Sequence, residues 1–339
     1  MLITQSVRAL EAYTPGEQPK CKNVVKLNTN ENPYPPSPKC AKALAAFDLD
    51  RLRRYPDPVF TELRRELARL NGTEIENIFI GNGSDEILTV AARTFVEDDE
   101  AIGSLDPSYS LYKTLAAIRN VPWVGVADPL SAMPRRKKIS LFLWTNPNAP
   151  TGVFRPVGDI AAFQKKFPGV VIVDEAYADF AKENCMALAT GRANRNLIVM
   201  RTFSKSYSLA GLRLGYAVGP AELIGAMYKV KDSYNVDAVA QAVGLSAVKD
   251  QKWMRRNVAK VVKTRTWFVR ELTERGWDVL PSEANFVFAR PAGGNAAGIF
   301  ERLRAKNIFV RYFSGPKTAD RLRITIGTDA EMKKLLAHL

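Results

Sequence analysis

Short apolar runs alternate with amphipathic stretches over much of the chain, and this alternation is the clearest structural signal in the sequence. The runs typical of buried strands span residues 78–80, 101–102, 123–126, 139–144, 170–173, 197–200 and 215–218. Helical patterns lie between most of them, and apolar residues recur at helical spacing over residues 60–70, before the first run. The sequence therefore predicts an α/β fold whose mostly parallel central sheet is flanked by helices.

The pattern changes towards both ends of the chain and divides it into three parts. Residues 1–35 are expected to form an arm, because the prolines that crowd residues 33–36 cannot lie inside a helix. Residues 36–235 contain the apolar runs and would form the large domain. A long helical stretch over 220–275 precedes further short runs at 286–289, 309–311 and 322–326. Residues 236–339 are therefore predicted to form a smaller α+β domain that packs with the arm.

Composition excludes several classes of protein. The 339 residues are 46% hydrophobic and 25% charged, which is ordinary for a globular protein. No apolar run reaches the roughly 18 residues that cross a bilayer, and the first residues lack an export signal, so we expect a cytoplasmic protein without a membrane partner. Cys21, Cys40 and Cys185 form no C-x-x-C pair, and the single histidine is His338. A metal site and a histidine-based triad are therefore not expected.

The net charge of +14 is open to two interpretations. A strongly basic protein can bind nucleic acid, but here the basic residues are spread along the chain and the densest runs, at 51–54 and 135–138, are short. A basic surface also suits a site that takes anionic substrates. We therefore expect small-molecule partners and no nucleic acid, and we keep a basic nucleic-acid-binding protein with an idle enzyme fold as the distant alternative.

Polar side chains follow three of the predicted strands at the point where each strand ends. Asn146 follows the run at 139–144, Asp174 follows the run at 170–173, and Lys205 comes shortly after the run at 197–200. Ligands of a parallel α/β sheet bind beyond the carboxyl ends of its strands. The sequence therefore places an amide, a carboxylate and an amine near one candidate site.

Lys205 and Asp174 have the chemistry that pyridoxal 5'-phosphate (PLP) requires. Lys205 lies among small polar residues, and partial desolvation there would favour the neutral amine that attacks carbonyl groups. A carboxylate such as Asp174 can keep the pyridine nitrogen protonated, so that the ring withdraws electrons. Each residue alone is more often ordinary, because most lysines are exposed and an aspartate at a strand end usually caps a helix.

A glycine-rich turn, residues 81–86, connects the run at 78–80 to a predicted helix. Backbone N–H groups at the start of a helix bind anions, so this turn could hold a phosphate, although alone it is more often a capped helix start. Arg213 could add a bidentate contact to the same phosphate. Tyr109 could stack on an aromatic cofactor, and Tyr177 could donate a hydrogen bond to it; a single aromatic residue is more often part of the core.

Taken together and in their order along the chain, these motifs resemble those of the class I/II aminotransferase superfamily, whose members are PLP enzymes of fold type I. Within that superfamily, they resemble the histidinol-phosphate aminotransferases. The segments that carry the resemblance are residues 27–34, 54–57, 81–88, 145–152, 173–177, 202–215, 283–286 and 322–328. The resemblance covers nearly the whole chain, and it implies the roles that follow.

The resemblance assigns the cofactor ring to residues at the strand ends. Lys205 would hold PLP as a Schiff base and would carry the proton between the substrate and the cofactor. Asp174 would pair with the pyridine nitrogen. Asn146 and Tyr177 would hold the ring oxygen, and Tyr109 would stack on the ring.

The phosphate would lie in a cup formed by a separate set of residues. The set consists of Gly83, Ser84, Asp85, Thr202, Ser204 and Arg213. Tyr55 would reach the phosphate of the neighbouring subunit's cofactor, which implies a homodimer with shared active sites. Arg323 would bind the anionic group of the substrate. Further candidates for the substrate pocket are Tyr13, Asn30, Glu31 and Arg311.

The implied reaction is reversible transamination between histidinol phosphate with 2-oxoglutarate and imidazole-acetol phosphate with glutamate, a step of histidine biosynthesis. A phosphate-bearing substrate suits an arginine-lined site, since guanidinium groups bind phosphate bidentately. Transamination of aromatic amino acids and decarboxylation of threonine phosphate would use the same Lys205 and Asp174, so both remain alternatives.

Overall fold

A seven-stranded sheet forms the centre of the computed structural model, which describes all residues except 1, 4, 9, 11–15, 21–22 and 131–137. The strands are β2 (Ile78–Gly81), β3 (Ala101–Leu105), β4 (Trp123–Val126), β5 (Ile139–Thr145), β6 (Val170–Asp174), β7 (Leu197–Thr202) and β8 (Gly215–Val218). Their order is β2-β8-β7-β6-β5-β3-β4, in which β8 is antiparallel to both its neighbours and the other neighbouring pairs are parallel. The predicted α/β fold with a mostly parallel sheet is confirmed.

Both faces of this sheet are buried, because successive side chains of each strand point to opposite sides and both sides are apolar. In β5, Leu141 and Leu143 belong to one core cluster, whereas Phe142 and Trp144 belong to the other. The first cluster packs under α4 (Gly83–Phe95), α5 (Leu111–Arg119) and α8 (Ala221–Val230). The second packs against α3 (Thr61–Asn71), α6 (Val157–Lys166), α7 (Met186–Thr190) and α9 (Ala238–Val248).

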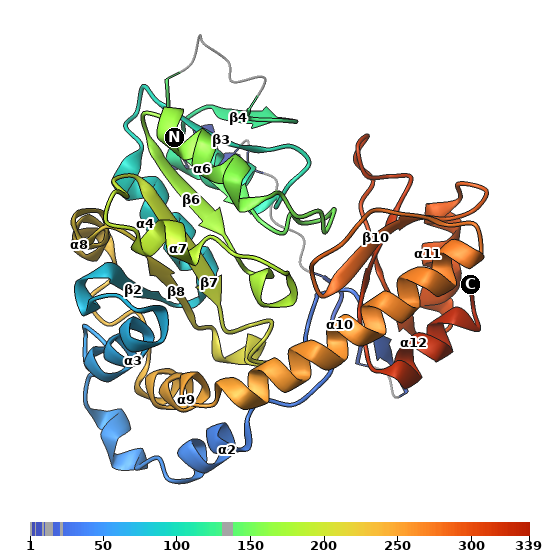
Figure 1. The fold of residues 1–339 in the computed structure, drawn as a ribbon, viewed down its shortest axis with the longest axis horizontal. Helices are drawn as coiled ribbons and strands as arrows, with labels where there is room; N and C mark the ends of the chain where they lie inside the picture. The colour runs from blue at the N-terminus through green and yellow to red at the C-terminus, as the bar shows by residue number, and fades with distance from the viewer. Residues whose placement is uncertain (1, 4, 9, 11–15, 21–22, 131–137) are drawn as a thin grey trace.

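The long helical stretch predicted over 220–275 consists of three helices: α8, α9 and α10 (Gln251–Glu274). The side chain of Asp237 caps α9 by accepting a hydrogen bond of 2.7 Å from the backbone N–H of Ala240. A new helix therefore begins after Asp237, within a stretch that apolar periodicity alone predicts as one continuous helix. Helix α10 extends from beside α9 to the smaller sheet and connects the two parts of the fold (Figure 1).

The C-terminal part holds a four-stranded antiparallel sheet in the order β12-β13-β10-β9. Its elements are β9 (Asp278–Val279), β10 (Phe286–Arg290), α11 (Ala296–Ala305), β12 (Arg311–Tyr312), β13 (Leu322–Thr325) and α12 (Asp329–Leu336). The run predicted as one strand at 309–311 divides between two sheets, because β11 (Ile308–Phe309) pairs in parallel with β1 (Val25–Lys26) of the N-terminal arm. The arm thus contacts this part, while the exact domain boundaries stay predictions.

Short elements complete the described chain. They are α1 (Gln5–Arg8), α2 (Pro38–Ala45), η1 (Leu49–Arg53), η2 (Ile75–Asn77), η3 (Ala178–Phe180) and η4 (Ala210–Leu212). Among the described residues, no helix combines the length and the apolar character that crossing a membrane requires. Cys40 and Cys185 are buried free thiols, and Cys21 lies outside the described residues.

Replacing Phe142 should destabilise the fold strongly. Its ring is fully buried and lies 4.8 Å from the ring of Phe163 and 5.9 Å from that of Trp144. We expect Phe142→Ala to lower the free energy of unfolding by about 3–5 kcal/mol, measured by denaturant titration, because the substitution leaves a cavity between the sheet and α6. The matched control is Ile118→Ala on the surface of α5, where we expect a change within about 0.5 kcal/mol. Equal effects at the two positions would contradict the core assignment.

Candidate active site

A cavity of about 720 Å³ lies beside the carboxyl ends of the central strands, between the large sheet and the smaller one. Most of the predicted site residues line it: Asn30, Glu31, Ser84, Asp85, Tyr109, Asp174, Tyr177, Thr202, Ser204, Lys205, Arg213, Arg311 and Arg323. Because these residues come from the arm, the large sheet and the smaller sheet, only the folded chain brings them together. Lys205 and Asp174 therefore face a common cavity.

The Lys205 side chain is partly buried in the loop that follows β7. Its Nζ atom donates a hydrogen bond of 3.1 Å to the carbonyl of Thr29 and lies 5.8 Å from the centre of the Tyr177 ring. Burial and then the positive charge of Arg323 lower the pKa of Lys205 to about 8. The neutral, nucleophilic amine is therefore far more populated at neutral pH than in an exposed lysine.

Asp174 is the last residue of β6, and its carboxylate is buried. Oδ2 accepts a hydrogen bond of 2.8 Å from the Tyr112 hydroxyl, and Oδ1 accepts one of 3.1 Å from the backbone N–H of Ala176. Burial raises the pKa of Asp174 to about 6, although the bond from Tyr112 opposes this. A cation beside this carboxylate would lower the pKa again, so the position suits a protonated ring nitrogen.

Tyr112 is a site residue that sequence analysis did not identify. Its hydroxyl is buried and contacts the Oγ1 atom of Thr145 at 2.5 Å in addition to Asp174. The only signal in the sequence was its position three residues after Tyr109, and that is also the spacing of an ordinary core residue on a helix. Its role depends on contacts that the sequence does not show.

The start of α4 forms an anion-binding corner of the cavity. The side chain of the N-cap residue, Asn82, makes no capping hydrogen bond, and Glu86 accepts from the backbone N–H of Asn82 itself rather than from the first turn, so the N–H groups of the first turn are available to an anion. Gly83 has φ +77°, and a Cβ atom there would lie 2.6 Å from Nη2 of Arg213. A Cβ atom on Gly215 would lie 2.8 Å from the backbone nitrogen of Ser84. Glycine at these two positions therefore lets Arg213 and β8 approach the helix start.

Polar side chains complete this corner. The Ser204 hydroxyl lies 3.0 Å from the Thr202 hydroxyl and 3.4 Å from Nη1 of Arg213. Asp85 accepts a hydrogen bond of 3.3 Å from the Tyr109 hydroxyl, and its other oxygen lies 3.5 Å from Nη2 of Arg213. Asp85 thus connects an aromatic ring of the cavity to its cationic corner.

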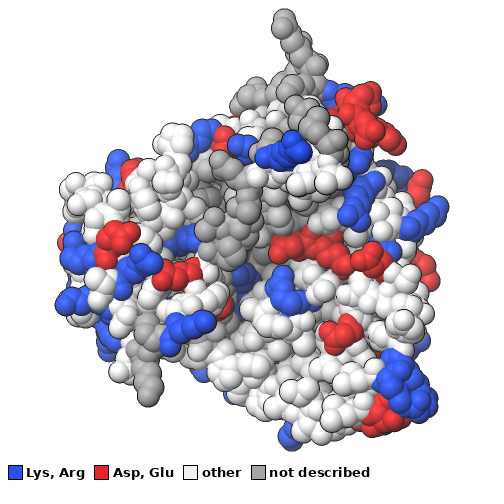
Figure 2. All heavy atoms as spheres, turned by 180° about the vertical axis from the view of Figure 1, so that it is seen from behind, with Lys and Arg blue, Asp and Glu red and all other residues white. Residues whose placement is uncertain are grey.

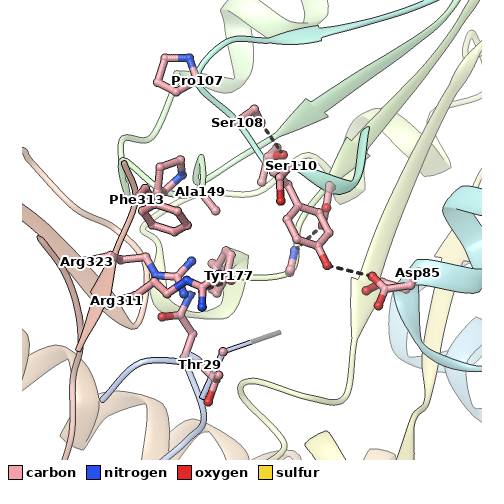
Figure 3. A pocket seen from close by; sticks show the side chains of 18 of the residues that line it. Thr29, Asp85, Pro107, Ser108, Ser110, Ala149, Tyr177, Arg311, Phe313 and Arg323 are labelled. Carbon is pink, nitrogen blue, oxygen red and sulfur yellow. Dashed lines mark hydrogen bonds between the residues drawn. The ribbon is translucent and has the colours of Figure 1, made fainter. Parts of the chain in front are cut away.

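Two guanidinium groups lie at the other end of the cavity, where Figure 3 shows Arg311, Arg323 and Tyr177 opposite Asp85. Nη2 of Arg323 donates a hydrogen bond of 2.9 Å to the carbonyl of Asn28, and its guanidinium lies 5.3 Å from the ring of Phe313. The guanidinium of Arg311 lies 5.3 Å from the same ring. Planar cations held against an aromatic ring suit the recognition of carboxylate or phosphate.

Residues of the N-terminal arm line the part of the cavity near Lys205. Asn30 donates a hydrogen bond of 3.0 Å to the Tyr177 hydroxyl. Glu31 forms an ion pair with Lys26. Burial alone would raise the pKa of Glu31, but the bonds from Lys26 and Thr29 outweigh burial, and its pKa is lowered. Glu31 therefore contributes negative charge near Lys205.

Among the described residues, three of the predicted site residues do not line the cavity. Asn146 is buried beside it, and its amide bonds to the backbone N–H and carbonyl of Arg155 at 2.8 and 3.0 Å. Gly83 is covered by the guanidinium group of Arg213. Tyr55 is exposed and stacks on Tyr234, with ring centres 4.3 Å apart. Tyr13 lies outside the described residues. The roles assigned to these residues stay predictions.

The donor set fits an aromatic ring that carries a phosphate. A nucleophilic amine can bond to a carbonyl carbon, and a buried carboxylate can pair with a ring nitrogen. The uncapped start of α4 with Arg213 supplies N–H donors and positive charge for a phosphate. The guanidinium groups at the opposite end remain available for the anionic groups of a substrate.

Known proteins resemble this chain over almost its entire length. A histidinol-phosphate aminotransferase of Syntrophotalea carbinolica is 44% identical over 342 residues, which cover 99% of this chain and 98% of the relative. Histidinol-phosphate aminotransferase 2 of Rhizobium meliloti is 44% identical and covers 98% of this chain and 97% of its own.

A solved structure has the same fold. The histidinol-phosphate aminotransferase of Sinorhizobium meliloti, crystallised in complex with pyridoxal-5'-phosphate, superposes with a TM-score of 0.89 at 27% sequence identity. It covers 99% of this chain and 96% of its own. The family description "Aminotransferase class I and II" matches residues 22–339. The residues that line the cavity, the relatives that match over nearly the full length and this family match together show that the chain belongs to the class I and II aminotransferase family.

Proposed function

We propose that the protein is a PLP-dependent aminotransferase whose active site is the cavity between the two sheets. The observation that carries the proposal is that a nucleophilic lysine, Lys205, and a buried carboxylate, Asp174, line one cavity that ends in an uncapped helix start. When bound, PLP supplies an electron-withdrawing pyridinium ring that makes the α-proton of an amino substrate acidic.

A different group of residues would bind each part of the cofactor. Asp174, held by Tyr112, would keep the ring nitrogen protonated through an ion pair. The first N–H groups of α4, with Ser204 and Arg213, would bind the phosphate. Tyr109, fixed by its bond to Asp85, would cover one face of the ring.

Lys205 would bind the cofactor and then act as the general acid and base. Its pKa of about 8 lies close to neutral pH, where a group can both accept and release a proton efficiently. The carbonyl of Thr29 and the ring of Tyr177 hold its Nζ atom within the cavity. Lys205 would thus hold one mobile proton at Nζ, where the reaction needs it.

We propose histidinol phosphate and 2-oxoglutarate as the substrates, with imidazole-acetol phosphate and glutamate as the products, as a step of histidine biosynthesis. Support comes from the relatives of that name at 44% identity, and from Arg311 and Arg323, which suit an anionic substrate. Aromatic transamination and threonine-phosphate decarboxylation would need the same lysine, so substrate tests must separate them. A cytoplasmic location, expected from the sequence, belongs to this proposal.

A homodimer with shared sites is part of the same proposal. Large apolar side chains are exposed close together in the sequence, at Leu44, Leu49, Leu52, Tyr55 and Val59. Contiguous patches of exposed apolar residues mark contact surfaces, and we propose that these side chains form such a patch. Tyr55, 80% exposed, would then reach the cofactor phosphate of the partner subunit.

The half-reaction of the PLP-loaded protein tests the substrate. We expect histidinol phosphate to convert bound PLP to the aminated cofactor at least about 100-fold faster than phenylalanine does, because phenylalanine carries no phosphate for the guanidinium groups to bind. The loss of visible absorbance measures this conversion. Lys205→Ala should show neither the visible band nor transfer. Equal rates with phenylalanine would favour the aromatic alternative, and carbon dioxide released from threonine phosphate would favour the decarboxylase.

Asp174→Asn tests the buried carboxylate through pH. In the cofactor-free protein, the pKa of Asp174 is about 6 when folded against about 3.9 when unfolded, so its contribution to stability is present below pH 4 and lost as the pH rises through 6. Compared with the wild type, the variant should therefore gain up to about 3 kcal/mol in unfolding free energy between pH 4 and 7.

Added PLP should favour the wild type instead of the variant. Asparagine carries no charge to pair with the ring nitrogen, so PLP should raise the melting temperature of the wild type more than that of the variant. A stability difference that does not change with pH, together with equal stabilisation by PLP, would contradict the role of Asp174.

Tyr55→Phe tests the shared site. The substitution keeps the ring that stacks on Tyr234 but removes the hydroxyl. We expect PLP to bind roughly 10-fold more weakly, since a hydrogen bond to a charged phosphate is lost, while sedimentation still shows a dimer. Tyr234→Phe is the matched control and should retain the cofactor. A monomeric wild type, or unchanged retention in Tyr55→Phe, would refute the shared site.

A further inference from the structure

A hydrogen-bonded group of three charged residues and one serine, here called the Arg201 network, lies behind the active site. It consists of Arg201, Glu175, Asp179 and Ser206. Arg201 of β7 donates to Oε2 of Glu175 from Nε at 3.0 Å and from Nη2 at 2.8 Å, and its Nη1 donates to Asp179 at 3.3 Å. The hydroxyl of Ser206 donates to the other Asp179 oxygen at 2.5 Å.

The network is buried and takes no part in lining the cavity. The Glu175 side chain is fully buried, and those of Arg201 and Asp179 are 15% and 21% exposed. Burying charges is costly, and a buried ion pair often stabilises a fold no better than apolar residues would. Stability alone is therefore a weak explanation for placing three charges at this point.

The position of the network in the chain suggests a more specific role. Glu175 directly follows Asp174, and Ser206 directly follows Lys205. A continuous series of hydrogen bonds thus joins the backbone beside the carboxylate to the backbone beside the amine. Within the sheet, Asp174 pairs in register with Met200, but the chain has already left β7 before it reaches Lys205.

The loop that carries Lys205 is anchored on both sides of this residue. The backbone N–H of Phe203 donates to the carbonyl of Leu214 at 2.9 Å, and the Tyr207 hydroxyl accepts from the Gln251 side chain at 2.9 Å. Between residues 203 and 209, its internal backbone bonds run from Ser208 to Lys205 at 3.2 Å and from Leu209 to Phe203 at 3.1 Å. From outside, Asn32 of the arm donates to the carbonyls of Lys205 and Ser206 at 3.1 and 3.3 Å. The Ser206 hydroxyl is therefore the side-chain contact that attaches this loop to the Arg201 network.

We propose that the Arg201 network positions Lys205 relative to Asp174, with Asp179 and Ser206 as positioning residues. The proposal rests on the proposed function for the role of Lys205. The charged groups that face Nζ are Glu31, Asp85, Arg213 and Arg323. A loop released from Asp179 would change the distances from Nζ to these charges and to the substrate, and misplacement by about 1 Å is enough to slow an enzyme substantially.

The experiment compares Ser206→Ala, Asp179→Asn and the double variant with the wild type. The chain offers a matched control, because Ser37 donates to Asp250 at the same distance of 2.5 Å, at the start of α2 and away from the cavity. Ser37→Ala therefore removes the same kind of bond as Ser206→Ala, and Asp250→Asn replaces the same kind of charged acceptor as Asp179→Asn. For all six proteins we would measure hydrogen exchange of residues 203–209, the pH midpoint of the visible PLP band, and kcat and KM.

We expect faster hydrogen exchange of residues 203–209 in Ser206→Ala and Asp179→Asn, together with a shifted pH midpoint of the band. In both, kcat should fall roughly 10-fold or more with KM changed less, because positioning acts on the reacting atoms. The double variant should be no worse than the more affected single variant, since both substitutions act on one bond, Ser206→Ala by removing its donor and Asp179→Asn by replacing its charged acceptor with a neutral one. The two control variants should match the wild type in all of these measurements.

Wild-type values of exchange, pH midpoint and kcat in Ser206→Ala and Asp179→Asn would overturn the proposal. So would additive losses in the double variant, or equal changes in the Ser37 and Asp250 controls. A wild-type protein that takes up no PLP would instead refute the proposed function. In that case, the exchange of residues 203–209 in the cofactor-free proteins would still decide whether the network holds the loop.

Discussion

The parallel pairing of β6 with β7 is the constraint on which the active site depends. Neighbouring parallel strands end at the same edge of a sheet, so the carboxylate that ends β6 and the loop that follows β7 must lie next to each other. The side chains on the two faces of these strands pack into two different core clusters, so a slip of one residue would exchange the two sets and disrupt the packing of both. The core thereby fixes the chemistry at its edge.

Burial at this edge moves both reactive groups towards their neutral forms. The pKa of Lys205 is lowered to about 8 and that of Asp174 is raised to about 6, and in each case burial is the largest cause. A lysine in this state is a nucleophile, and a carboxylate in this state gains most from a cationic partner. The same physical effect therefore prepares the two groups for different tasks, while the Arg201 network keeps its own charges paired.

The cavity needs all three parts of the chain. The large sheet supplies the amine, the carboxylate and the helix start, the smaller sheet supplies Arg311 and Arg323, and the arm supplies the carbonyl of Thr29 and the amide of Asn32 that hold Lys205 and its loop. Pairing of β1 with β11 attaches the arm to the C-terminal part. Any movement between the two sheets would therefore change the arginines and the arm contacts together.

The sequence by itself determined the seven central strands and placed Lys205 and Asp174 at strand ends, because apolar periodicity and polar strand ends are local signals. Most of the site residues that it named line the cavity, although several of them, such as Arg323, were implied only by the resemblance. It could not reveal that Tyr112, whose spacing is that of a core residue, donates a hydrogen bond to Asp174. It also could not show that the side-chain amide of Asn146 is hydrogen-bonded to the backbone of Arg155. Nor could it show that the helical stretch over 220–275 is three helices, or that the run at 309–311 divides between two sheets. Only the tertiary structure decided the contacts of Tyr112 and Asn146 and the divided strand, since these depend on pairing between distant residues that no local pattern encodes. The break before α9 depends instead on a local cap at Asp237, which apolar periodicity does not register.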